Sequence, residues 1–504
     1  MARIKVHSSG KVYTIEGAEG ARLIDVLREH SFEVYAPCGG NGTCGKCKVL
    51  IKDKGYVTSC IHYIGEDMEV ILPAPMEASI LASQYKFSKV MPLDPGEAAN
   101  LSVYPFGVAI DIGTTTVVFY LFQLITGSII ETQTVMNPQG KYGADVISRI
   151  QYCITNPGGL QTLQKEMIDI INVKLLYFAS QHGFAPEDIV KITVTGNTTM
   201  LHLLLGKDPS SLAFVPFTPV FTDEQKYAAV SLNLKCNQEA EVKVLPSLSA
   251  YVGSDIIAGM ASLAIPEDQR NYLYVDIGTN GEMALVTPGA VYACATAAGP
   301  AFEGANISCG MGALDGAIKT FDGPDSYQTV GDMKPVGICG SGLIDIIAMM
   351  VRTGAVPADG FLPEDYVVVE KERAGKTDAI IITQADIREI QLAKSAICAG
   401  ILTLVQKAGL TIGEVDAFYL AGGFGNYIRI SSAVEIGMIP AGLSDKVISV
   451  GNASGTGAIL AVSSTRFDNE ISKTLQDMEL IELSEDDTFN LEFAMNMEFP
   501  VIQQ

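Results

Sequence analysis

The 504-residue chain contains no tryptophan, only five histidines and no run of about eighteen uncharged apolar residues, which is the length that a membrane-spanning helix approaches. The first ten residues, MARIKVHSSG, lack the apolar core of a signal peptide. No two histidines have the spacing of a metal-binding pair, which argues against a histidine metal centre. We therefore expect a protein that neither spans a membrane nor is secreted, and we predict a cytoplasmic location.

Basic residues are also scarce. The chain has 34 Lys and Arg against 57 Asp and Glu, a formal net charge of -23. Nucleic-acid binding depends on clustered Lys and Arg that neutralise phosphates, so we expect no nucleic-acid partner. A length of 504 residues allows two to four domains, each with its own core.

Cysteines are unevenly distributed, with four of the ten between residues 38 and 60. Cys38, Cys44 and Cys47 have the spacing C-x5-C-x2-C, and Cys60 follows after twelve residues. Plant-type 2Fe-2S ferredoxins use a similar C-x4-C-x2-C and a fourth, distant cysteine. Structural zinc sites usually repeat a short C-x2-C pair, and only one such pair is present here. We predict that these four cysteines bind a 2Fe-2S cluster.

The segments around the cysteines favour the same interpretation. RIKVHSSGKVYTIEG alternates apolar and polar residues around a turn, ARLIDVLREH predicts a helix, and CKVLIKD and MEVILPA predict strands. Glycines between the cysteines allow a tight loop whose N-H groups point at the cluster sulfurs. These glycines are Gly39, Gly40, Gly42 and Gly45. The order of elements resembles the β-grasp ferredoxin fold, and the C-x5-C spacing is similar to its adrenodoxin-like branch.

A different motif begins at residue 106 with FGVAIDIGTTTVVFYLF, which predicts two apolar strands joined by a turn. The turn offers N-H groups and hydroxyls to an anion, and Asp111 can hold a cation through water. The turn residues are Gly113, Thr114, Thr115 and Thr116. A buried strand pair with an ordinary turn remains the alternative for this motif taken alone.

The motif is repeated at residue 272 as YLYVDIGTNGEMALVT. The aligned residues are Asp276, Gly278, Thr279 and Asn280. Two copies predict two duplicated subdomains that hold one nucleotide between them. A third segment, VDAFYLAGGFGNYI, delivers Gly422, Gly423 and Gly425, where missing side chains leave room for a base or ribose. In this order the three motifs resemble the phosphate-1, phosphate-2 and adenosine motifs of the ASKHA superfamily.

The internal phrases NPQGKYGADVISRI, VTGNTTMLHLLLG, ATAAGPAFEGANI and GICGSGLID narrow the resemblance. Together with the ferredoxin segment, they are similar to the reductive activators of corrinoid proteins, the RACo family. The resemblance implies an α+β and α/β multidomain protein with a β-grasp ferredoxin domain and two RNase-H-like ASKHA subdomains. We expect a ferredoxin domain at 1-75, a linker at 76-104, and ATPase subdomains at 105-268 and 269-504.

The family resemblance also implies an activity and its partners. ATP would drive one electron from the 2Fe-2S cluster onto Co(II) of a corrinoid methyl carrier and regenerate Co(I). An upstream low-potential electron donor and a homodimer are further expectations. Fusion of an electron carrier to an ATPase itself suggests coupling, because each tenfold uphill step of a one-electron transfer costs about 59 mV. We expect complex formation to remove or replace a ligand of Co(II), and ATP hydrolysis to release the reduced product.

Roles in the ATPase follow from residue type and position. Asp111 and Asp276 are predicted to orient Mg2+-bound waters or the attacking water, while the turn residues contact phosphates and the three glycines contact adenosine. Other candidates have a structural explanation, as helix starts or buried turns, that is about equally good, and for Asn197 with Thr198 the buried turn is favoured. They are Asp145, Glu303, Ser341 and Asn197 with Thr198. Cys339 is the weakest candidate, as a cluster ligand at a dimer interface.

Other function classes remain open at this point. The chain could donate electrons to a different low-potential enzyme, such as a dehydratase. It could also be a small-molecule kinase with a redox-sensing ferredoxin domain, although no sugar-binding constellation is apparent. A nucleotide-gated binding module that only detaches an inactive partner is the non-enzymatic alternative.

Overall fold

A computed structural model provides the fold of this protein. It describes residues 1-8, 11-30, 32, 34, 40, 42, 47-52, 54-72, 105-263, 265, 269-278, 280-304, 306-376, 378-422 and 427-501. In these ranges, none of the helices combines the length and apolarity needed to cross a bilayer. The predicted linker at 76-104 lies outside the described residues.

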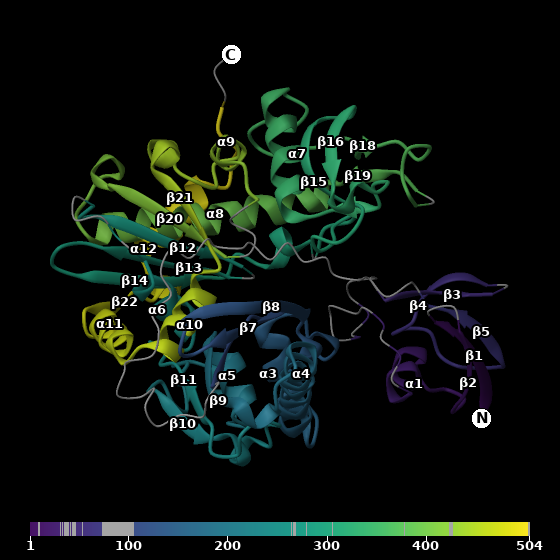
Figure 1. The fold of residues 1–504 in the computed structure, drawn as a ribbon. Helices are drawn as coiled ribbons and strands as arrows, with labels where there is room; N and C mark the ends of the chain where they lie inside the picture. Colours follow the sequence, from purple (N-terminus) through teal and green to yellow (C-terminus); the bar gives the residue numbers. More distant parts are fainter. Residues whose placement is uncertain are drawn as a thin grey trace.

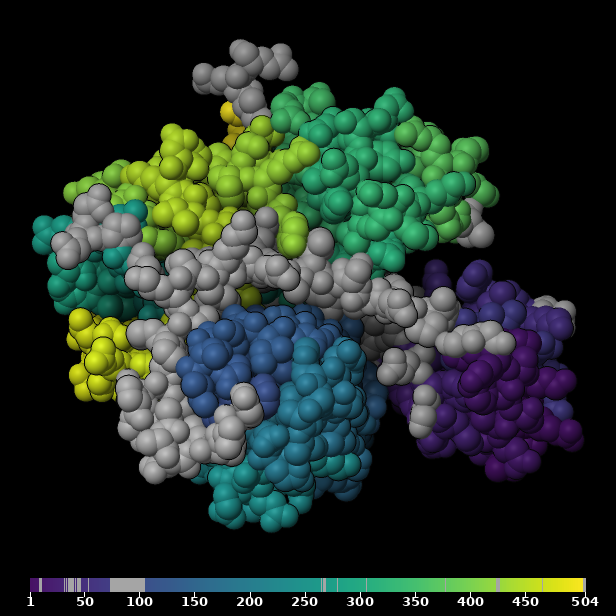
Figure 2. All heavy atoms as spheres, in the orientation of Figure 1, coloured from purple at the N-terminus to yellow at the C-terminus, as the bar shows by residue number. Residues whose placement is uncertain are grey.

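The N-terminal sheet confirms the predicted β-grasp arrangement, with strand order β2-β1-β5-β3-β4. Its strands are β1 (Ala2–Ser8), β2 (Lys11–Gly17), β3 (Lys48–Ile51), β4 (Gly55–Thr58) and β5 (Met68–Ile71). Helix α1 (Leu23–Glu29) packs Leu23, Ile24 and Leu27 into the core beneath the sheet, and all three are fully buried. Residues 1-72 form a separate lobe at one side of the molecule (Figure 2).

Two further sheets share the topology of five strands and differ in the edge that carries the sixth, β10 or β22, which confirms the predicted duplication. Their orders are β10-β11-β9-β6-β7-β8 and β21-β20-β12-β13-β14-β22. In each sheet an antiparallel hairpin, β6-β7 or β12-β13, pairs in parallel with a later strand, β9 or β20. The strands of the first are β6 (Phe106–Ile112), β7 (Thr116–Gln123), β8 (Ser128–Met136), β9 (Ile189–Gly196), β10 (Gln225–Ala228) and β11 (Glu241–Val244). Those of the second are β12 (Tyr272–Ile277), β13 (Gly281–Val286), β14 (Val291–Thr296), β20 (Ala417–Ala421), β21 (Val447–Gly451) and β22 (Met478–Leu480).

Helices cover the sheets and join the two halves. They are α3 (Val146–Thr155), α4 (Gly159–His182), α5 (Thr198–Leu204), α6 (Ser254–Ala261), α7 (Gly340–Arg352), α8 (Gln384–Lys407), α9 (Ile430–Glu435), α10 (Ala453–Ser463), α11 (Thr465–Gln476) and α12 (Asp487–Met495). Helices α6 and α10 pack against each other between the two sheets (Figure 1). The chain therefore returns through α10 to the first half before it adds β22 and α12 to the second.

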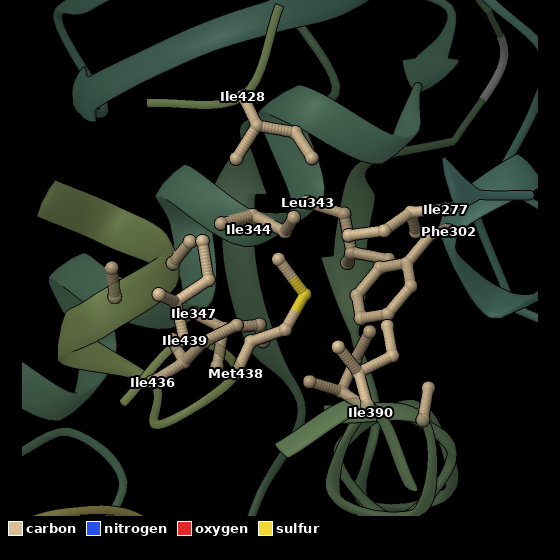
Figure 3. Packing of buried hydrophobic residues seen from close by; sticks show 14 of the residues in the cluster. Ile277, Phe302, Leu343, Ile344, Ile347, Ile390, Ile428, Ile436, Met438 and Ile439 are labelled. Atoms are coloured by element: carbon tan, nitrogen blue, oxygen red, sulfur yellow. The ribbon is translucent and has the colours of Figure 1, made fainter. Parts of the chain in front are cut away.

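An insertion between β14 and α8 enlarges the second half. Its strands are β15 (Ala317–Gly323), β16 (Ser326–Thr329), β17 (Gly337–Ile338), β18 (Tyr366–Val369) and β19 (Ile380–Ile382). Ile277 at the end of β12 and Phe302 pack with Leu343 of α7 and Ile390 of α8 in one apolar core (Figure 3). The strand that carries the second phosphate motif is thus anchored in the largest core of the protein.

The α6-α10 crossing depends on a glycine without a side chain. A Cβ at Gly457 would lie 2.3 Å from the Ala258 carbonyl oxygen, so the backbones must move apart to accept it. We expect Gly457→Ala to lower the free energy of unfolding by about 1-3 kcal/mol. Gly289→Ala is the matched control, because a Cβ there meets no atom within 4 Å. Urea unfolding of both variants measures the difference, and equal stabilities would contradict the expectation.

Candidate cluster and nucleotide sites

Two of the four predicted cluster ligands are described, and they lie side by side. Cys47 and Cys60 are buried, and the Cys60 N-H donates to Cys47 Sγ at 3.4 Å. Gly40 and Gly42 in the preceding loop have φ of 91° and 81°, the left-handed region that glycine favours. Two adjoining thiols beside a tightly turned loop fit a 2Fe-2S cluster. Cys38 and Cys44 lie outside the described residues, as do Gly39 and Gly45.

Asp111 at the end of β6 is held by the start of α10. Asn452 Nδ2 donates to one carboxylate oxygen at 2.7 Å, and Ser454 Oγ donates to the other at 2.9 Å. The enclosing protein raises the pKa of Asp111, while these two hydrogen bonds oppose the rise. The first hairpin is therefore fixed by residues that come from near the end of the chain.

Two side-chain amides donate hydrogen bonds to the turn of the first hairpin. Asn137 Nδ2 donates to the Gly113 carbonyl at 2.8 Å, and Asn197 Nδ2 donates to Thr114 Oγ1 at 3.0 Å. Asn197 also caps α5 through its side-chain oxygen. The sequence analysis favoured a buried turn for this asparagine; the structure adds a direct contact with the phosphate hairpin.

Arg149 lies at the site but was not predicted from the sequence. Its side chain is fully buried in α3, and its guanidinium donates to the carbonyl oxygens of Thr114 and Gly143. Burial lowers the pKa of Arg149 to about 10, so the group remains charged at neutral pH. A fixed positive charge thus lies behind a turn that is expected to bind phosphate. The sequence feature that could have indicated this role is an arginine in the first turn of α3, the first α-helix after strands β6 to β8.

The third motif lies against the second hairpin. Gly422 has φ of 94°, and a Cβ there would lie 2.6 Å from Asp276 Oδ1. The Gly278 N-H donates to the Asn280 carbonyl at 2.9 Å, which closes the second turn. Thr279, Gly423 and Gly425 lie outside the described residues. The predicted phosphate-2 and adenosine motifs therefore meet at Asp276.

Two further carboxylates surround the predicted pair. Asp276 acts electrostatically on Asp255 at the start of α6 and on Glu282 of β13, and Asp111 acts on Asp276. Burial is the larger cause, and the charge of Asp111 the smaller one, that raise the pKa of Asp276 from 3.8 to about 7. The pKa values of Asp255 and Glu282 are also raised, mainly by burial and secondarily by the neighbouring carboxylates. All four carboxylates keep part of their side chains exposed. Such a group of acids favours a bound cation.

Direct ligation by three side chains is not part of this arrangement. Within the ranges that the structure covers, no three His, Cys, Asp or Glu side chains are placed to hold a metal ion together. Mg2+ usually keeps several of its waters and takes few protein ligands, so mostly buried carboxylates that keep some exposure fit a hydrated Mg2+ that accompanies a nucleotide.

Glu303 connects the two halves, whereas other secondary candidates have structural roles. Thr115 Oγ1 of the first hairpin donates to Glu303 Oε2 at 2.8 Å. Asp145 caps α3 in a capping box with Ser148. Ser341 at the start of α7 donates to the Lys319 carbonyl at 2.8 Å. Cys339 is buried and donates to the Ile318 carbonyl.

Family comparisons agree with this geometry. Residues 270-504 match the model described as the C-terminal domain of RACo, the ASKHA domain, and residues 106-268 match the RACo middle region. The chain belongs to the RACo family. Residues 6-70 match the 2Fe-2S iron-sulfur cluster binding domain, which supports a 2Fe-2S cluster in this RACo-family protein.

Individual relatives span three quarters or more of this RACo-family chain. The corrinoid activation enzyme RamQ of Eubacterium limosum is 28% identical over 96% of this chain and 97% of its own. The [Co(II) methylated amine-specific corrinoid protein] reductase of Methanosarcina barkeri is 26% identical over 76% of this chain and 75% of its own. A solved structure described as "Reductive activator for corrinoid,iron-sulfur protein" is 29% identical to this chain, with a TM-score of 0.71. The match covers 99% of this chain and 98% of that one.

The raised pKa values predict how stability depends on pH without Mg2+ and nucleotide. A carboxyl with a raised folded-state pKa stabilises the fold below its unfolded pKa, and that stabilisation is lost as pH rises through the folded value. For Asp276 the loss runs from about pH 4 to above pH 7. Asp255→Asn removes a titrating neighbour and its repulsion, so we expect a shallower fall of the free energy of unfolding with pH.

Chemical unfolding across this pH range measures the slope. Asp445→Asn is the control, since Asp445 is exposed and bonds only its neighbour Ser444 among the contacts described. Slopes that are identical in wild type and Asp255→Asn would contradict the prediction.

Proposed function

We propose that this RACo-family protein uses ATP hydrolysis to drive the one-electron reduction of a corrinoid protein from Co(II) to Co(I). The observation that carries the proposal is the covalent union, in one chain, of paired cluster thiols with two phosphate hairpins that meet around four carboxylates. The named activities of the relatives support the choice of acceptor. The protein acts in the cytoplasm as a homodimer, and an upstream low-potential donor reduces its cluster again.

The nucleotide lies between the two hairpins. The N-H groups and hydroxyls of Thr114, Thr115 and Thr116 contact the terminal phosphates, and Arg149 supplies positive charge behind them. The second turn, with Gly278, Thr279 and Asn280, contacts the phosphates from the other half. The glycines that bind adenosine are Gly422, Gly423 and Gly425.

Asp111 and Asp276 orient the hydrated Mg2+ and the attacking water. Mg2+ held there would supply charge neutralisation, so that Asp276 would remain ionised although its pKa without the ion is about 7. The hydrogen bonds from Asn452 and Ser454 fix the orientation of the Asp111 carboxylate before nucleotide binds. Hydrolysis then converts ATP and water to ADP and phosphate.

Coupling to the partner begins at the contact between Thr115 and Glu303. A phosphate at the hairpin turn competes with Glu303 for the Thr115 hydroxyl, so binding changes the connection between the two halves. Two arrangements of the halves can drive reduction only if they bind Co(II) and Co(I) partners with different affinity. A cluster held by Cys38, Cys44, Cys47 and Cys60 would supply the one electron that the cobalt gains.

Reduction of a corrinoid partner tests the proposal directly. We expect chemically reduced protein, freed of dithionite and mixed with a Co(II) corrinoid methyl carrier, to produce the Co(I) absorption band only with Mg-ATP. Cys44→Ala should abolish the reaction and the visible cluster spectrum while keeping ATP binding. Failure to form Co(I) with any carrier, despite a reducible cluster and active hydrolysis, would indicate another low-potential enzyme as the acceptor.

The ATPase site has its own test. Asp276→Ala should keep the cluster spectrum and lose ATP hydrolysis by at least about 100-fold, since a residue that orients the reacting water or metal is removed. Asp445→Ala is the control and should hydrolyse ATP at the wild-type rate. Phosphate release assays measure both, and undiminished turnover in Asp276→Ala would move the site elsewhere.

A further inference from the structure

Helix α1 places one arginine just before its start and another in its last turn, and both reach the cluster loop. Arg22 Nη1 donates to the Gly40 carbonyl at 2.9 Å. Arg28 approaches the same residue: a Cβ built on Gly40 would lie 3.5 Å from Arg28 Nη1 and 3.7 Å from Cys60 Cβ. The Arg28 guanidinium and the Cys60 side chain therefore face one point of the loop backbone.

The two arginines differ in their surroundings. Arg22 Nε donates to Asp25 Oδ2 at 2.7 Å and Nη2 donates to Oδ1 at 3.1 Å, so a carboxylate balances its charge. Arg28 is half-buried, and burial lowers its pKa while Asp25, Tyr142 and Cys47 act electrostatically on it. An arginine keeps its proton at neutral pH despite such a shift. Arg22 thus holds the loop, and Arg28 brings positive charge to it.

We propose that Arg28 raises the reduction potential of the cluster by placing a fixed positive charge beside the loop at Gly40 and Cys60. Reduction adds one electron and makes the cluster one unit more negative, so a nearby cation favours the reduced form. Charge and hydrogen bonding around the sulfurs are general determinants of cluster potentials. The interaction is strong because the enclosed side of α1 screens charges less than water does. The inference rests on cluster binding by the cysteines, and not on the corrinoid acceptor.

Redox titration of the full-length protein, followed by electron paramagnetic resonance, tests this role without any enzymatic assay. We expect Arg28→Gln to shift the one-electron equilibrium about tenfold toward the oxidised cluster, a fall in midpoint of about 59 mV. Arg28→Lys keeps the charge and should stay near the wild-type midpoint. Lys54→Gln is the matched control. Lys54 lies just before the start of β4, whereas Cys60 follows the end of that strand, and the Lys54 side chain pairs with Glu66.

The outcomes separate the proposal from a purely structural role. A full cluster in Arg28→Gln with an unchanged midpoint would overturn it, and so would an equal fall in Lys54→Gln. If Arg28→Gln holds no cluster, Arg28→His decides, since histidine loses its charge near pH 6.5. Its midpoint should then fall relative to wild type as pH rises from about 5.5 to 8. A midpoint that runs parallel to wild type over this range would refute the role of charge.

The same titration is independent of the proposed reaction. A protein that fails to reduce any corrinoid carrier, but whose midpoint falls in Arg28→Gln, would refute the acceptor and leave the role of Arg28 intact. If the wild-type protein forms Co(I) but the midpoint is unchanged in Arg28→Gln, the corrinoid acceptor stands and the role of Arg28 is refuted.

Discussion

The gathering of acidic side chains between the two halves is the constraint on which the rest of the structure depends. Carboxylates that are partly withdrawn from water repel one another, and their raised pKa values record that cost. Asp111 is tolerated there because Asn452 and Ser454, more than 300 residues away in the chain, donate to both of its oxygens. The hydrated cation and nucleotide that we propose for this site would relieve the repulsion.

The helices that build this site also join the two halves. Asp255 lies at the start of α6, the Asp111 donors lie at the start of α10, and the two helices cross at Gly457. A change in the charge of these carboxylates therefore affects the helices through which the two halves contact each other. Glu303 adds a direct link from the second half to the first phosphate turn. Under the proposed function, ATP bound at this turn would act directly on the contact between the two halves.

The N-terminal lobe meets a different requirement. Its loop must hold thiolates close together, and the side chains of α1 supply donors and positive charge to that loop. The side chains of α1 that reach the loop are the cations Arg22 and Arg28, whereas the two predicted phosphate hairpins meet around four carboxylates. Linking the two in one chain keeps electron donor and ATPase at a fixed one-to-one ratio.

The sequence by itself determined the three-part organisation, because hairpin patterns, cysteine spacing and the repeated Asp-Ile-Gly-Thr motif are local features. Strand pairing and the packing of Leu23, Ile24 and Leu27 followed from those patterns. Glu282 and Arg149 were not predicted as site residues although they lie on or next to the predicted hairpins. Asp255, Asn452 and Ser454 were missed because they reach the site only through the α6-α10 crossing. Only tertiary structure decides such contacts, since a single carboxylate or asparagine carries no local signal of the partner that folding brings to it.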